Sequence, residues 1–103
     1  MNSTNKLEEA IIELYKTVKK LRSENGCPWD KNQTSESLSQ YILQEAYEVL
    51  ESIDSKGKNL SEELGDLLFQ IIIQSVIAEE SNSFTFIKVV KQINEKLIER
   101  HPH

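Results

Sequence analysis

The chain has 103 residues and a formal net charge of -5 at pH 7, with 17 acidic against 12 basic side chains. This length suits one domain, and the acidic balance argues against nucleic acid or an anionic membrane surface as the main partner. Only three glycines and two prolines interrupt the chain, and 38% of its residues are hydrophobic. We therefore expect one all-α domain over residues 1–103, built from a few long helices.

The first predicted helix covers residues 6–23, with Thr4 or Asn5 capping its start. Its apolar side chains recur in steps of four and three and form one seam: Leu7, Ile11, Leu14, Val18 and Leu21. Four cations occupy its C-terminal half: Lys16, Lys19, Lys20 and Arg22. A solvated basic face is the favoured interpretation of these cations, and phosphate contact is the alternative.

Residues 24–33 are expected to form a loop, because Gly26 and Pro28 break helices. The loop holds Trp29, the only tryptophan, and Cys27, the only cysteine. The indole either covers the core, which is slightly favoured, or offers a platform to a planar ligand such as a base. A single cysteine cannot form an internal disulfide, so a cytoplasmic location is the expectation.

The next helix is expected to start after Thr34 or Ser35 and to run to about residue 54, and another covers residues 60–80. The short turn 55–59 between them predicts an antiparallel hairpin. Asn59 and Glu62 resemble a capping pair for the second helix. That helix is apolar nearly all round but too short in its apolar part for a membrane span, which needs ~20 residues. We expect it to pack within its own chain and against a second chain, with no membrane partner.

A fourth helix is expected over residues 86–100, capped by Thr85 and ended by Pro102. Lys96 and Arg100 lie one turn apart near its end, and two histidines follow. This segment is either a frayed, charged terminus or an anion clamp for phosphate oxygens.

Two acidic motifs lie in the predicted hairpin, and each places two carboxylates three residues apart on one helix face: Glu45 with Glu48, and Glu63 with Asp66. Four carboxylates in apolar surroundings repel one another and need a neutralising partner. All-oxygen ligands suit hard cations such as Mg²⁺ or Mn²⁺, which would support attack of water on a phosphoanhydride. Such pairs also occur by chance on solvated faces, and the residues alone leave the two interpretations balanced.

These motifs, in this order and spacing, closely resemble the MazG family of nucleoside triphosphate pyrophosphohydrolases: Gly26-Cys27-Pro28-Trp29-Asp30, Glu45-Ala46-Tyr47-Glu48, Glu63-Leu64-Gly65-Asp66-Leu67-Leu68 and Arg100-His101-Pro102-His103. The resemblance implies a four-helix, MazG-like bundle that is completed by dimerisation, as a homodimer or a dimer of dimers. It implies Mg²⁺-dependent hydrolysis of standard or non-standard nucleoside triphosphates to monophosphate and pyrophosphate, a housecleaning of the nucleotide pool. It implies catalytic metal ligands at four positions: Glu45, Glu48, Glu63 and Asp66.

The residues expected to contact the substrate are Trp29, Lys31, Lys96 and Arg100. The chain departs from the family's motif at Gln44, where the motif has a glutamate. The lost charge supports an alternative, a nucleotide-binding or regulatory helical dimer with weakened catalysis. A third hypothesis is a purely structural helical dimer that binds no metal.

Gly65 inside a helix costs ~1 kcal/mol relative to alanine. A close approach of helices, or packing alone, would explain why a glycine stands there.

Overall fold

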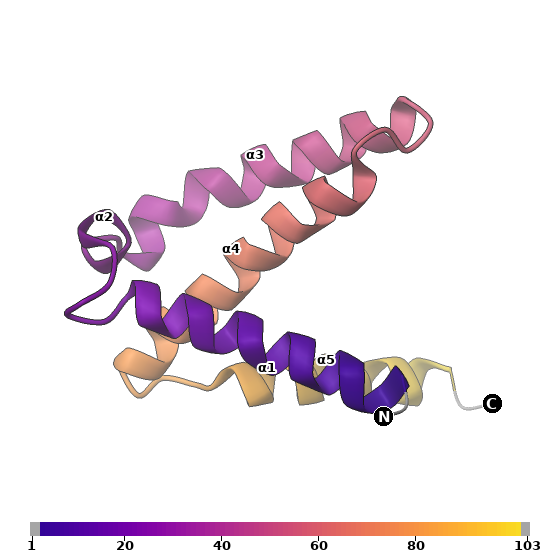
Figure 1. Ribbon diagram of the computed structural model, residues 1–103. Coiled ribbons are helices and arrows are strands. Elements are labelled where there is room, and N and C mark those ends of the chain that lie inside the picture. Colours follow the sequence, from indigo (N-terminus) through magenta and orange to yellow (C-terminus); the bar gives the residue numbers. More distant parts are fainter. Residues whose placement is uncertain (1–2, 102–103) are drawn as a thin grey trace.

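The computed structural model describes residues 3–101, which form five helices and no strand (Figure 1). Their bounds are α1 Ser3–Leu21, α2 Pro28–Lys31, α3 Ser35–Asp54, α4 Leu60–Glu80 and α5 Phe86–Arg100. The all-α prediction is therefore confirmed. Pro102 and His103, named in the sequence motifs, lie outside the described residues. None of the described helices combines the length and the apolar character that crossing a membrane requires.

The N-terminal part differs from the prediction in two places. The first helix covers Ser3–Leu21, so residues 4 and 5, the expected caps, lie inside it and not before it. The expected loop contains α2, a single turn that starts at Pro28, where proline is favoured because its missing N–H has no helical partner to lose. Gly26 allows the tight return before α2, since a Cβ there would lie 2.1 Å from the carbonyl oxygen of Lys20.

The starts of α3 and α5 follow local capping signals. Thr34 Oγ1 accepts a hydrogen bond from the Ser37 N–H, and Ser37 Oγ accepts one from the Thr34 N–H, which together form a capping box. Thr85 caps α5 by accepting from the N–H of Lys88 at 3.2 Å. The expected pair of Asn59 with Glu62 is wrong. Asn59 instead has a left-handed backbone, with φ 60°, and its side chain makes no cap bond.

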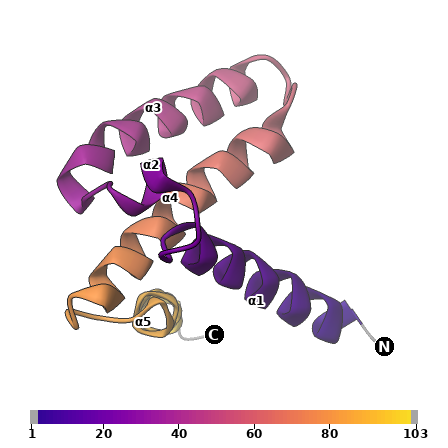
Figure 2. The same ribbon diagram turned by 60° about the vertical axis from the view of Figure 1, so that its left-hand side comes forward.

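Helix α4 is the centre of the fold. Helix α3 packs antiparallel along it, which confirms the predicted hairpin, and α1 and α5 pack on its C-terminal half (Figures 1 and 2). The buried core combines residues of α1, α3 and α4: Val18, Leu38, Ile72, Ile73 and Val76. Glu79 of α4 links α1 to α5, because it accepts a hydrogen bond from Tyr15 Oη at 2.5 Å and another from the Phe86 N–H at 2.8 Å.

The four long helices do not close into a compact bundle within one chain. The radius of gyration is 15.4 Å, whereas a compact chain of this length has about 13 Å. The α3–α4 hairpin extends away from α1 and α5, as Figure 2 shows. On α3, Leu38 is buried in the core, whereas Ile53 near the far end of the helix is 55% exposed. The expected second chain over these faces stays a prediction.

Candidate metal centre

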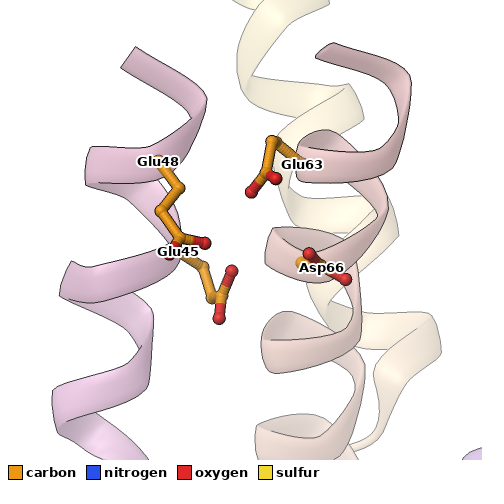
Figure 3. Close-up of side chains that lie close together, drawn as sticks. All are labelled: Glu45, Glu48, Glu63 and Asp66. Atoms are coloured by element: carbon orange, nitrogen blue, oxygen red, sulfur yellow. The ribbon is translucent and has the colours of Figure 1, made fainter. Parts of the chain in front are cut away.

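The four carboxylates that the sequence singles out lie together between α3 and α4 (Figure 3). One oxygen atom from each carboxylate lies within 4.8 Å of the others. Glu45 and Glu48 come from adjacent turns of α3, and Glu63 and Asp66 come from adjacent turns of α4. The antiparallel hairpin therefore turns two i, i+3 pairs toward one another. The three glutamates are half-buried, whereas Asp66 is exposed and leaves one side of the cluster open to solvent.

Two of these side chains carry buried oxygen atoms that lack a hydrogen-bond partner in the described part of the chain: Oε2 of Glu45 and Oε2 of Glu63. Burial raises the pKa of the Glu45 carboxyl, and contact with Glu48 and repulsion from the other acids raise it further. The pKa of Glu63 is raised by burial first and by Glu48 next. The protein alone therefore disfavours full ionisation of the cluster.

The donor set fits a divalent cation that prefers oxygen ligands. All four groups are carboxylates, with no histidine or cysteine among them, which suits Mg²⁺ or Mn²⁺ better than zinc. The ion pairs found in residues 3–101 lie elsewhere, between Lys19 and Glu79 and between Arg22 and Glu80. A bound cation would thus supply a positive charge that no ion pair of residues 3–101 supplies to these carboxylates.

The expected substrate contacts are spread over other elements. Trp29 is 52% exposed, and its ring lies edge-on to that of Tyr41, one turn before Glu45 on α3, with centroids 6.2 Å apart. Lys31 is the exposed last residue of α2. Lys96 and Arg100 are exposed on α5, which packs on α4 and not on α3 in the described chain. A single chain does not gather these cations beside the carboxylates.

Gln44 and Gly65 belong to the acidic motifs but lie outside the carboxylate cluster. Gln44 is exposed and lies outside the group of four carboxylates. Gly65 does not mark a close helix approach, because a Cβ placed there would meet no described atom within 4 Å. The packing explanation for Gly65 fails with it, so nothing in the described chain requires a glycine at this position.

Arg22 is a structural residue that the sequence did not distinguish from the other cations of α1. Its side chain is only 9% exposed, and it pairs with Glu80 at 2.6 Å. The same guanidinium donates to three backbone carbonyls of the segment around α2: those of Asp30, Lys31 and Gln33, at 2.7, 3.2 and 2.6 Å. Arg22 therefore joins α1, α2 and α4. Backbone acceptors carry no sequence signature, so only its place at the end of a helix hinted at this role.

A large groove lies away from the carboxylates. It has a volume of about 930 Å³ and runs between α1 and α5, where its lining is mostly apolar and includes Ile11, Tyr15, Phe86 and Val90. Its walls include no residue of α3. The candidate metal centre on the hairpin is therefore separate from this groove.

Comparisons with known proteins give consistent matches. Residues 33–103 match the family described as the MazG nucleotide pyrophosphohydrolase domain. The chain is 49% identical over 92 residues to the nucleoside triphosphate pyrophosphohydrolase/pyrophosphatase MazG of Thermotoga maritima, which covers 88% of this chain and 36% of that protein. It is 44% identical over 95 residues to the nucleoside triphosphate pyrophosphohydrolase of Escherichia coli K12, covering 90% and 36%. The corresponding protein of Mycobacterium tuberculosis is 37% identical over 97 residues, covering 91% and 29%. The chain thus spans about a third of the length of these relatives.

Proposed function

Because the chain belongs to the MazG family of nucleotide pyrophosphohydrolases, we propose that it hydrolyses nucleoside triphosphates to the monophosphate and pyrophosphate. The observation that carries this proposal is the convergence of four carboxylates, two of which present buried, unpaired oxygens among the described residues. The relatives from T. maritima and E. coli carry names for this activity and support it. We propose that residues 1–103 act as one such domain, in the cytoplasm.

The proposed cofactor is Mg²⁺, with Mn²⁺ as a possible substitute, held by the four carboxylates. When bound, the cation would neutralise triphosphate charge and lower the pKa of the attacking water. The two glutamates of α3 and the two acids of α4 lie on either side of one point, where the hairpin would hold the cation. The unpaired Oε2 atoms of Glu45 and Glu63 would gain a partner there. The exposure of Asp66 supports entry of the substrate from that side.

The proposed base contact is Trp29, and the proposed phosphate contacts are Lys31, Lys96 and Arg100. The exposed indole is linked through Tyr41 to the helix that carries Glu45 and Glu48, which supports its role. The cations of α5 do not lie beside α3 in one chain. A second chain packed against the exposed face of α3 would bring further cations to the site.

We therefore propose that the working unit is a homodimer or a dimer of dimers. The large radius of gyration and the uncovered apolar side chains on three helices support this assembly. The uncovered side chains include Leu7 on α1, Leu43 on α3 and Ile87 on α5. Burial of such side chains is the main favourable term in association.

The alternative, a nucleotide-binding dimer with little hydrolysis, is less well supported. It rests on Gln44, which replaces the first glutamate of the motif. Gln44 is exposed, and the four carboxylates converge without it. We therefore propose that its loss of charge changes rate or substrate preference and does not remove the site.

The experiment that tests the proposal is pyrophosphate release from a panel of standard and non-standard nucleoside triphosphates with Mg²⁺. We expect release with at least one substrate, its loss in Glu48→Gln, and retention in Glu51→Gln, which changes an exposed glutamate on the same helix. No release with any triphosphate would refute hydrolysis. Tight binding of nucleotide and Mg²⁺ in calorimetry without release would select the alternative, and recovery of release in Gln44→Glu would identify its cause.

A further inference from the structure

Gln70 is a buried amide on α4 that neither the core nor the carboxylate cluster explains. It is 7% exposed, and its Oε1 is buried without a hydrogen-bond partner in the described chain. A buried polar atom without a partner destabilises the fold, so natural cores rarely keep one. The same helix carries a second glutamine amide whose hydrogen bonds are satisfied. Gln74, one turn later, accepts from Ser35 Oγ at 2.6 Å and donates to the Ser35 carbonyl at 3.0 Å.

The position of Gln70 along α4 places it on the face that carries the acidic residues. It follows Glu63 by seven residues and Asp66 by four. At ~100° per residue, it lies about 20° from Glu63 and about 40° from Asp66 around the helix axis, between the two. It lies about 6 Å from Asp66 along the axis, on the side of the core. Gln70 is therefore the next polar group below the cluster on the same stripe of α4.

The chemistry of the amide suits this place. A neutral carbonyl oxygen accepts a hydrogen bond without adding a fifth negative charge to the four carboxylates. The amide stays neutral at every pH at which the protein is folded. A carboxyl group there would have its pKa raised by repulsion from the four carboxylates and would tend to be protonated. An oxygen of this kind can orient a water molecule that a cation-loaded cluster would also hold.

We propose that Gln70 is a positioning residue of the acidic cluster, and that its Oε1 accepts a hydrogen bond from a water molecule shared with the carboxylates when a divalent cation is bound. The proposal rests on the proposed metal centre. It explains why the free chain keeps an unpaired amide oxygen in its interior. Partners of this kind, one step removed from the metal ligands, typically change metal affinity or activity 10- to 100-fold when they are replaced.

The test compares Gln70→Met with Gln74→Met, which make the same change one turn apart. Gln70→Met removes an unpaired polar atom, so we expect the urea midpoint of the metal-free protein to rise. We also expect its affinity for Mn²⁺, measured by calorimetry, to fall about 10-fold or more, with a similar fall in kcat and little change in KM. Gln74→Met breaks two hydrogen bonds, so its midpoint should fall, while its affinity for Mn²⁺ stays within about twofold of the unchanged chain.

Gln70→Glu supplies a second variant, because it keeps an acceptor oxygen, and we expect it to bind Mn²⁺ better than Gln70→Met does. The proposal is overturned if Gln70→Met leaves Mn²⁺ affinity unchanged, or if it lowers the urea midpoint as Gln74→Met does, because the amide would then have a structural partner. If the unchanged chain releases no pyrophosphate from any triphosphate, hydrolysis is refuted, and the Mn²⁺ affinities of the two methionine variants still decide the role of Gln70.

Discussion

Replacing Arg22 with methionine is expected to lower the free energy of unfolding by about 3 kcal/mol. Methionine keeps an apolar stem of similar length but removes every donor. The guanidinium makes partly buried hydrogen bonds to the carbonyls of Asp30 and Gln33, a more exposed one to Lys31, and a pair with Glu80. The variant therefore removes contacts between α1, α2 and α4 at once.

The magnitude follows from the exposure of each partner. A hydrogen bond from a charged group contributes ~1.5–3 kcal/mol to stability. The bonds to the two partly buried carbonyls account for most of the loss. Each contributes somewhat less than this range, because water partly replaces the guanidinium in the variant. The bond to Lys31 is exposed and adds little. Glu80 is 44% exposed, so its pair adds less than ~1 kcal/mol. For a chain of this length the sum corresponds to a fall in Tm of roughly 12–24 °C.

The assay is urea unfolding of the metal-free protein at fixed concentration, followed by helical circular dichroism and by the fluorescence of Trp29 in α2. Glu80→Gln is the matched control, since it weakens the ion pair and keeps the three carbonyl contacts. It should cost less than ~1 kcal/mol. Equal costs for the two variants would refute the reasoning, because the carbonyls would then contribute nothing.

Two further predictions concern the hairpin. Gly65→Ala should stabilise the protein by about 0.5–1 kcal/mol in thermal unfolding, because alanine favours the helix and its Cβ would meet open space; a loss of stability would mean that a second chain or a ligand approaches there. The raised pKa values of Glu45 and Glu63 mean that the folded, metal-free protein binds more protons than the unfolded chain does. Their contribution to stability is therefore complete below the ordinary glutamate pKa of ~4.3 and is lost as the pH rises through the raised values. Urea midpoints between pH 4 and pH 7.5 should show this loss, and saturating Mg²⁺ should remove most of it; a loss that Mg²⁺ leaves intact would contradict a cation site.

The hairpin and its carboxylates were predictable because each depends on local signals. Thr34 and Thr85 mark helix starts by hydrogen bonds within three residues. A five-residue turn leaves antiparallel packing as the compact solution. Once the hairpin exists, i, i+3 spacing brings Glu45 and Glu63 to the same side.

The features that the sequence did not predict depend on contacts between distant elements. Arg22 resembles its neighbouring lysines until the carbonyls around α2 fold back onto it. Gln70 lies in a helix that is apolar nearly all round, and only the folded structure shows that this amide is buried. The left-handed backbone of Asn59 replaced a plausible cap, because both geometries suit asparagine. The arrangement of α1 and α5 on α4 has no local signal.

The two halves of α4 have separate tasks. Its C-terminal half lies under α1, α3 and α5, whereas its N-terminal half has α3 as its only neighbour in the described chain and carries Glu63 and Asp66. The far end of the hairpin thus has only two helices packed together, and repulsion between the carboxylates opposes their approach. An ion bound there would bridge α3 and α4 at the open end of the hairpin. Metal binding would then also stabilise the hairpin against local unfolding.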